Sequence, residues 1–370
     1  MPPAPSGSAR AAAGSSRPEA RAERAAGRFE RQAAACAVLG SPLYAGLLRH
    51  AARDLRAGGV VARVLGEHLD DPGREALALR LLGGVHALVL TGRAAGLAAF
   101  YPSAGGTADP GPGAGRAWRA LRRVLAERGD EVRPWLERPP QTNEIGRGAA
   151  LAGALCHIVA EADLPVRLVE VGASAGLNLR ADRFRITGPG AAFGDPASPV
   201  TIAGGWQGSP PPAGPVDVIA RTGGDVAPVD PLSDDGRLRL AAYVWPDQVA
   251  RLARLRGALV LASQVHADLR AEPASVTLAR TALEPGTWTV LWHSVMRHYL
   301  DPAEASALDA GVAALAGAAT PASRFAHVSL ELAPGTPDAP VELVTWPGGR
   351  RRRLGTAPPH GIPVTWANPG

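Results

Sequence analysis

Lysine is absent from this chain of 370 residues, so arginine supplies all 39 residues of the Lys+Arg count. The absence excludes Schiff-base chemistry on a lysine and the lysine of a Walker A phosphate-binding loop. Cysteine is almost as scarce, because only Cys36 and Cys156 occur. Two cysteines cannot build a disulfide framework or a cysteine-rich zinc or iron–sulfur site. We therefore expect no metal site.

Long apolar runs are also absent, since none approaches the ~20 residues that a membrane-spanning helix needs. The N-terminus shows no secretory apolar segment, so we expect a cytoplasmic protein without a membrane partner. The net charge is only +5, and the arginines are scattered along the chain. Scattered charge does not build the basic face that nucleic-acid-binding proteins present, so nucleic acid is not an expected partner.

The composition changes near residue 164 and predicts two folded parts after a tail. Residues 1–25 are rich in Ala, Pro, Ser, Gly and Arg without periodicity, which is typical of a disordered segment. Residues 26–163 carry apolar side chains at helical spacing and predict an all-α N-terminal domain. Residues 164–370 alternate between strand-like and helix-like stretches, with an insertion at about 182–215. Pro246 should break a long helix of this second part.

Strands that alternate with helices predict an α/β fold, with a mostly parallel sheet and helices on both faces. The strand-like runs are Val166–Val171, Val216–Ala220 and Thr287–Trp292. Near the C-terminus, Val341–Trp346 and Pro363–Trp366 predict an antiparallel hairpin around an arginine-rich turn, Arg350–Arg353. The arginines of that turn should face solvent.

One stretch, LVEVGASAGLNLR at Leu168–Arg180, combines three local features. A short apolar run leads into the glycine turn Gly172–Gly176, and a helix-compatible stretch begins at Leu177. Strand, turn and helix in this order bring backbone N–H groups and the positive end of a helix dipole to one point. The pattern predicts that a nucleotide-like cofactor binds there.

Two enzyme classes fit this turn only in part. The dinucleotide pattern G-x-G-x-x-G fails at two of its three glycines. The serine-hydrolase pattern G-x-S-x-G matches Gly172–Gly176, with Ser174 as nucleophile. Asp225 or Asp230, followed by His293, would complete the chain order Ser, Asp, His. That hydrolase turn normally follows several strands of its sheet, whereas the residues upstream of this one are helical in pattern.

The segment VEVGASAGLNL resembles the first motif of the class I S-adenosylmethionine-dependent methyltransferases. The resemblance implies a Rossmann-like fold, S-adenosyl-L-methionine as cofactor and methyl transfer to a small molecule. An acid at the end of the next strand would hold the ribose hydroxyls, and by position Asp225 fits, with Asp230 as its rival. The cofactor-binding residues implied in this way are Glu170, Gly172, Ala173, Ser174, Gly176, Asn178, Asp225 and Asp230.

A second segment, LWHSVMRHYLDPAE, is similar to the residues that follow the fourth strand of such enzymes. It makes His293 a candidate catalytic base and Tyr299 a candidate substrate contact. The polar stretch QTNE adds Asn143 and Glu144 as candidate substrate contacts, or else it only caps the following helix. The helical part of the chain would then be a lid or substrate-recognition domain. Ser174 stands where the usual middle glycine is expected.

Nearly the whole chain also resembles an actinobacterial family known only as domain of unknown function 2332. The segments that carry this resemblance are SPLYAGLLRHAARDL, YPSAGG, QTNEIGR, LVEVGASAGLNLR, FGDPASPV, RTGGDVAPVDP, YVWPDQVARL and HSVMRHYL. The resemblance implies that the helical and sheet parts belong together, but it carries no activity. Three functions stay open: a methyltransferase, a hydrolase that uses Ser174, and a non-catalytic protein of the same fold that binds a ligand or partner.

Overall fold

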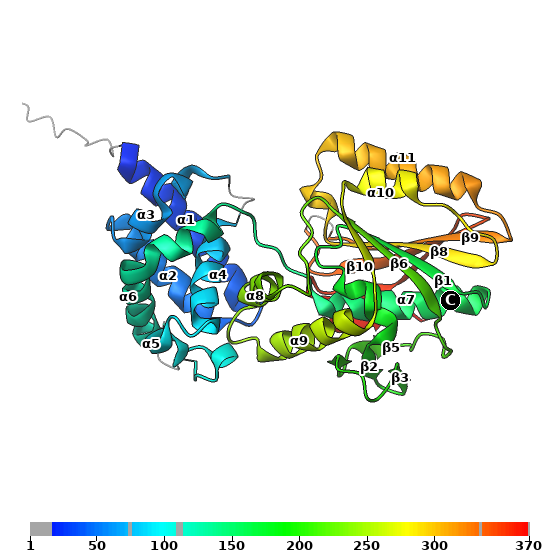
Figure 1. The fold of residues 1–370 in the computed structure, drawn as a ribbon, viewed down its shortest axis with the longest axis horizontal. Helices are drawn as coiled ribbons and strands as arrows, with labels where there is room; N and C mark the ends of the chain where they lie inside the picture. Colours follow the sequence, from blue (N-terminus) through cyan, green and yellow to red (C-terminus); the bar gives the residue numbers. More distant parts are fainter. Residues whose placement is uncertain (1–16, 73–75, 109–113, 333–334, 369–370) are drawn as a thin grey trace, which may run out of the picture. The chain divides into compact units, whose positions relative to one another are not determined.

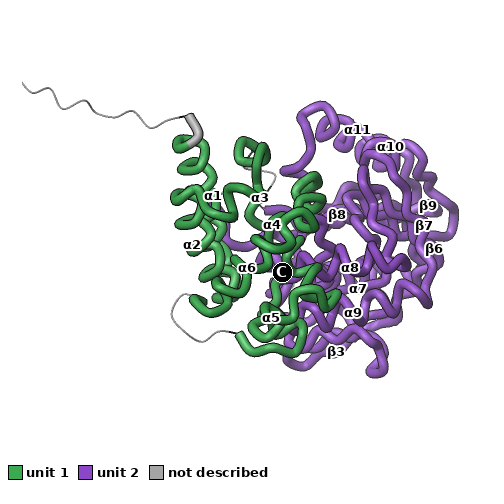
Figure 2. Tube along the Cα trace, turned by 60° about the vertical axis from the view of Figure 1, so that its left-hand side comes forward, with its two compact units in different colours: residues 1–140, 245–248 green, residues 141–244, 249–370 purple. Residues whose placement is uncertain are grey.

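A computed structural model describes residues 17–72, 76–108, 114–332 and 335–368, which fall into two compact units (Figures 1 and 2). The helical unit contains the described residues up to Pro140 together with Trp245–Gln248. The sheet unit contains Gln141–Val244 and the chain from Val249 onward. The α/β architecture, with N-terminal helices, a mostly parallel sheet and an antiparallel C-terminal hairpin, is confirmed.

The helical unit is built from amphipathic helices whose leucine, valine and alanine side chains form one buried core. Its α-helices are α1 (Arg17–Val38), α2 (Pro42–Arg56), α3 (Val60–Leu65), α4 (Leu77–Leu90), α5 (Ala95–Ala98) and α6 (Gly115–Val132). Short 3-10 turns are η1 (Gly66–Asp70), η3 (Pro102–Ala104) and η4 (Arg133–Leu136).

Helix α1 begins inside the segment that we expected to be disordered. Ala25, Ala26 and Phe29 are fully buried along one face of this helix, which packs against α2. This apolar face stabilises the helix, although the composition of residues 17–25 alone resembles that of a disordered tail. The prediction is therefore wrong for residues 17–25, and residues 1–16 lie outside the described ranges.

The segment Trp245–Gln248 packs within the helical unit, although it lies in the second half of the sequence. Ser41 caps α2 by accepting the Tyr44 N–H at 3.4 Å, and its hydroxyl donates to Asp247 Oδ1 at 2.6 Å. The Trp245 ring lies 6.3 Å from the Tyr44 ring. Pro246 separates two helices of the sheet unit, as its position in the sequence predicts.

The sheet unit contains a sheet of nine strands in the order β5-β12-β11-β10-β9-β8-β1-β6-β7. Its strands are β1 (Val166–Val171), β5 (Trp206–Gly208), β6 (Val218–Asp225), β7 (Asp268–Ala271), β8 (Thr287–Ser294), β9 (Ser323–Leu330), β10 (Ala339–Trp346), β11 (Arg350–Ala357) and β12 (Val364–Trp366). The expected insertion forms a small sheet, β3-β2-β4, from β2 (Arg185–Gly188), β3 (Ala191–Phe193) and β4 (Thr201–Ile202).

Strands β7, β6, β1, β8 and β9 all run parallel to one another. From β1 the chain passes outward to β6 and β7, then returns to β8 on the other side of β1 and continues to β9. The order of strands therefore reverses between β1 and β8. Side chains near the carboxyl ends of these strands meet at one edge, called here the carboxyl edge, where open α/β sheets bind ligands.

Helices cover both faces of this sheet (Figure 1). One face packs against α10 (Ala274–Arg280) and α11 (Pro302–Ala318), whose buried leucines meet Val169 and Leu291. The main core lies on the other face, where the helical elements are η5 (Ile145–Arg147), α7 (Gly148–Glu161), η6 (Leu177–Arg183), α8 (Asp234–Ala242) and α9 (Val249–Gln264).

The boundary between the units lies at residue 140, not at the expected residue 163. Helix α7 was assigned to the helical part, yet Leu151, Leu155 and Ile158 are fully buried in the core of the sheet unit. The helix is apolar nearly all round, because small residues occupy most of its other positions. A helix of that composition needs a surface that covers it on several sides, and the sheet provides one.

The C-terminal arginines form a strand, not the turn that we expected. Residues Arg350–Arg353 open β11, which pairs antiparallel with β10. The turn between these strands contains Gly348 and Gly349, both at positive φ. Arg351 reaches Glu342 of β10 at 3.4 Å, so the charges lie on a paired strand. Successive side chains of a strand point to opposite faces of the sheet, so these arginines can reach solvent while their backbone pairs with β10.

Candidate functional site

The glycine turn lies at the carboxyl edge, directly after β1 and next to the point where the strand order reverses. Gly172, Ser174 and Gly176 have φ angles of +67°, +53° and +64°. An added Cβ on Gly172 would lie 2.9 Å from Cβ of Met296, so glycine is required here by both conformation and space. Ser174 holds a left-handed conformation that costs free energy for a residue with a side chain.

Several backbone N–H groups of this turn donate hydrogen bonds to other residues of the chain. Ala173 N–H donates to the Gly224 carbonyl at 3.1 Å, and Ser174 N–H donates to Asp225 Oδ2 at 2.8 Å. Leu177 N–H donates to Asn143 Oδ1 at 2.8 Å. The turn is thus held firmly between β6 and the segment before α7.

The expected helix after the turn is not an α-helix. Residues Leu177–Arg183 form the 3-10 helix η6, with a break at Arg180. A 3-10 helix of 7 residues with a break at Arg180 has only a small dipole, and Asn143 Oδ1 already accepts its first N–H. The prediction that the positive end of an α-helix dipole lies beside the turn is therefore wrong.

The QTNE segment lies along the turn and braces it. Gln141 Oε1 accepts the Ser174 hydroxyl at 2.9 Å, and the Glu144 carbonyl accepts from Asn178 Nδ2 at 3.2 Å. The Glu144 carboxylate caps η5 at Gly146 N–H (3.1 Å) and pairs with Arg251 at 2.6 Å. The capping interpretation holds for Glu144, while Asn143 caps η6. Their contact with a substrate stays a prediction.

Glu170 is an unusual buried acid at this edge. Only 3% of its surface is exposed, and its Oε2 has no hydrogen-bond partner. Burial raises the pKa of Glu170 to about 8, although the nearby Trp292 indole and Arg180 guanidinium oppose the shift. The group is therefore largely neutral at pH 7 and able to donate a hydrogen bond. Asn178 Oδ1 is a second buried polar atom without a partner.

Of the two aspartates that compete for the ribose role, Asp225 lies at the turn. Its Oδ2 accepts from Ser174 N–H and its Oδ1 from Ala227 N–H at 2.9 Å, yet the residue stays partly exposed. Asp230 lies farther along the loop, is exposed, and accepts the Leu232 N–H at 2.9 Å. The structure therefore brings Asp225, and not Asp230, into hydrogen-bond contact with the glycine turn.

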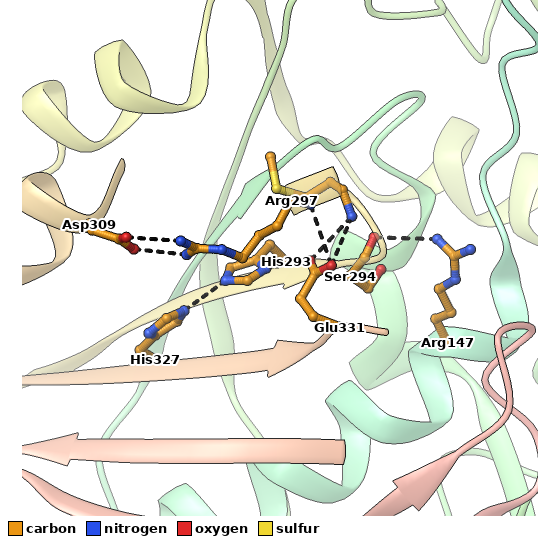
Figure 3. A network of polar contacts seen from close by, with 8 residues as sticks. Arg147, His293, Ser294, Arg297, Asp309, His327 and Glu331 are labelled. Atoms are coloured by element: carbon orange, nitrogen blue, oxygen red, sulfur yellow. Dashed lines mark hydrogen bonds and ion pairs between the residues drawn. The ribbon is translucent and has the colours of Figure 1, made fainter. Parts of the chain in front are cut away.

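His293 lies near the carboxyl end of β8 and is 1% exposed (Figure 3). Its Nδ1 is 2.8 Å from Glu331 Oε1, and its Nε2 is 2.9 Å from His327 Nε2. A carboxylate only accepts, so Nδ1 of His293 carries a proton, and of the two facing Nε2 atoms one donates to the other. Burial, followed by the charge of His293, lowers the pKa of His327 to about 3, so this ring is neutral at pH 7.

Glu331 joins this network to the loop after β8. Its carboxylate accepts the N–H of Met296 at 3.2 Å and the N–H of Arg297 at 3.4 Å. Arg297 in turn pairs with both carboxylate oxygens of Asp309 on α11, at 2.8 and 2.9 Å. The glycine turn, Met296 and Glu331 are therefore linked through one set of contacts at the carboxyl edge.

Glu331 and His327 were not among the residues expected at this site, whereas Gln141 belongs to the QTNE stretch. Glu331 lies 38 residues after His293 and becomes its neighbour only because β8 and β9 pair in parallel. An acid one residue beyond a strand-like run was the available signal. Tyr299, a candidate substrate contact, is 72% exposed beside the same loop.

The parts of a serine-hydrolase triad do not meet in this structure. The Ser174 hydroxyl donates to Gln141, and both ring nitrogens of His293 are engaged by Glu331 and His327. Asp225 binds backbone N–H groups instead of an imidazole. Ser174 therefore fits the G-x-S-x-G pattern in sequence but lacks the hydrogen bond to a histidine that activates a catalytic serine.

Over the described ranges, no group of three or more His, Cys, Asp and Glu side chains is arranged to hold a metal ion. No helix found within these ranges combines the length and apolar character needed to cross a membrane.

A protein family described as "Uncharacterized protein conserved in bacteria (DUF2332)" matches residues 26–366 of the chain. No curated protein and no solved structure matches the chain significantly. The match spans both units, which agrees with the expectation that the helical and sheet parts belong to one protein.

Proposed function

The chain belongs to this family of uncharacterized bacterial proteins, and we propose that it binds S-adenosyl-L-methionine and transfers the methyl group to a small molecule. The observation that carries the proposal is the strand order β7-β6-β1-β8-β9, which reverses beside the glycine turn. Dinucleotide-type folds bind their ligands at such a reversal, with an acid after the neighbouring strand to hold the ribose. Asp225 ends that strand here.

Residues at this edge suit the adenosine part of the cofactor. Asp225 is partly exposed and a carboxylate accepts more than two hydrogen bonds, so ribose hydroxyls can add to its backbone contacts. The unpartnered Glu170 Oε2 and Asn178 Oδ1 offer further polar contacts. The cofactor, when bound, supplies an electrophilic methyl group.

In this proposal the side chains of the chain position the reactants and accept a proton. Glu331 is the acid beside the loop after β8, with a side chain 18% exposed. His293 donates to it and is itself held by His327. We assign His293 the role of orienting Glu331, because both nitrogens of this buried ring are engaged. An acceptor hydroxyl or amine could then give its proton to Glu331.

Calorimetric titration with S-adenosylhomocysteine, the demethylated product of the cofactor, tests the proposal. We expect binding to the intact protein, a loss of about tenfold or more in Asp225→Ala, and little change in Asp230→Ala. Asp230→Ala is the matched control, since this exposed acid also binds a loop N–H but not the glycine turn. Absence of heat with folded wild-type protein at high micromolar ligand would refute the proposal.

A further inference from the structure

Arg147 lies at the end of β8 with hydrogen-bond donors to spare (Figure 3). Its Nη1 donates to the Ser294 carbonyl at 3.4 Å and its Nε to the Pro359 carbonyl at 3.1 Å. Both acceptors are neutral, and none of the described carboxylates forms an ion pair with this guanidinium. Its Nη2 has no hydrogen-bond partner among the described residues. The side chain is nevertheless only partly exposed.

The two acids whose charges raise the pKa of Arg147 already have other partners. Glu144 is bound by Arg251 at 2.6 Å, and Glu331 is bound by His293 and by two backbone N–H groups. Arg180, which is buried, differs because all three of its guanidinium nitrogens donate to carbonyls. Arg147 thus places a cation with a spare donor at the carboxyl edge, where an anion from outside the chain can bind it.

The methyltransferase resemblance implies a helix N-terminus that faces the carboxylate of the cofactor, but no α-helix begins after the glycine turn. Leu177 N–H and Ser174 N–H are engaged by Asn143 and Asp225, and η6 provides no α-helix dipole. Resting on the function proposed above, we propose that Arg147 binds the carboxylate of the amino-acid half of S-adenosylmethionine. Guanidinium and carboxylate groups form paired, charge-assisted hydrogen bonds, which are strong where water is partly excluded.

A comparison of two ligands distinguishes the contact between Arg147 and the carboxylate from binding of the rest of the cofactor. S-adenosylhomocysteine carries the carboxylate, whereas 5′-methylthioadenosine has the adenosine and thioether but no amino acid. We expect wild-type protein to prefer S-adenosylhomocysteine by about ten- to a hundredfold in calorimetry, and Arg147→Met to lose that preference while 5′-methylthioadenosine binds as before. Unchanged binding of the truncated ligand also shows that the variant is folded.

Arg147→Lys keeps the charge without the paired donors and should retain part of the preference, which provides a second variant if Arg147→Met does not fold. Arg167→Met is the matched control, because Arg167 pairs with Glu284 at 3.0 Å in the amino-terminal half of β1. A wild-type preference in both Arg147 variants would overturn the role of Arg147 and leave the proposed function standing. If neither ligand bound wild-type protein, both proposals would fall.

Discussion

The Asp225 carboxylate at the end of β6 accepts the Ser174 N–H of the neighbouring glycine turn at 2.8 Å. Gln141 and Asn143 hold the same turn from the other side, through the Ser174 hydroxyl and the Leu177 N–H. The turn therefore has its conformation before any ligand arrives. A preorganised backbone reduces the entropy that a ligand must lose on binding.

Gly172→Ala should destabilise the fold by about 2–4 kcal/mol in urea unfolding, because the new Cβ adds steric overlap with Met296 to the left-handed strain. The matched control is Gly190→Ala, at φ +69° with open space around it, which should cost only ~1 kcal/mol. Equal losses in the two variants would contradict close packing of Met296 on the turn.

Glu170 should make the stability of the protein fall as the pH rises. Its pKa is about 8 in the folded protein against an ordinary value of 4.5, so the folded state binds more protons between these values. The stabilisation is complete below about pH 4.5 and is lost as the pH approaches and passes 8. The loss is on the order of 5 kcal/mol. Urea unfolding of wild type and Glu170→Gln from pH 5 to 9 measures this difference.

Glu170→Gln replaces the acid by a neutral group of similar shape, so its stability should change much less over this range. Glu161→Gln is a suitable control, because Glu161 is a more exposed acid that pairs with Arg352. Parallel stability curves for wild type and Glu170→Gln would show that Glu170 has an ordinary pKa.

Glu331 should fix the protonation of His293. Nitrogen-15 NMR at pH 7 should show a proton on Nδ1 of His293, because the Glu331 carboxylate beside this nitrogen only accepts. Glu331→Ala should abolish this pattern and destabilise the protein by about 2–4 kcal/mol, because it also leaves two backbone N–H groups without an acceptor.

Glu284→Ala is the control for this measurement, because Glu284 pairs with Arg167 in the amino-terminal half of β1, and neither of these charges acts on the pKa of His327. It should leave both imidazole spectra unchanged. An unaltered His293 tautomer in Glu331→Ala would mean that another group sets the proton position.

Local pattern predicts the elements whose signal lies within a few residues. The apolar run before Gly172, the glycine turn and the break at Pro246 follow from strand, turn and proline chemistry. The local pattern does not predict strand β7, because Asp268–Ala271 is short and half polar. Helix α1 and the strand at Arg350–Arg353 were misjudged, because burial against a neighbour outweighed their composition.

The sequence by itself determined the α/β class, the turn at Gly172–Gly176 and the acids Glu170 and Asp225 as its neighbours. Only the tertiary structure decided which distant groups meet there. Parallel pairing of β8 with β9 unites His293 with Glu331, and the path of the chain before α7 carries Arg147 to the end of β8. Such contacts depend on strand order and register, which no local spacing encodes.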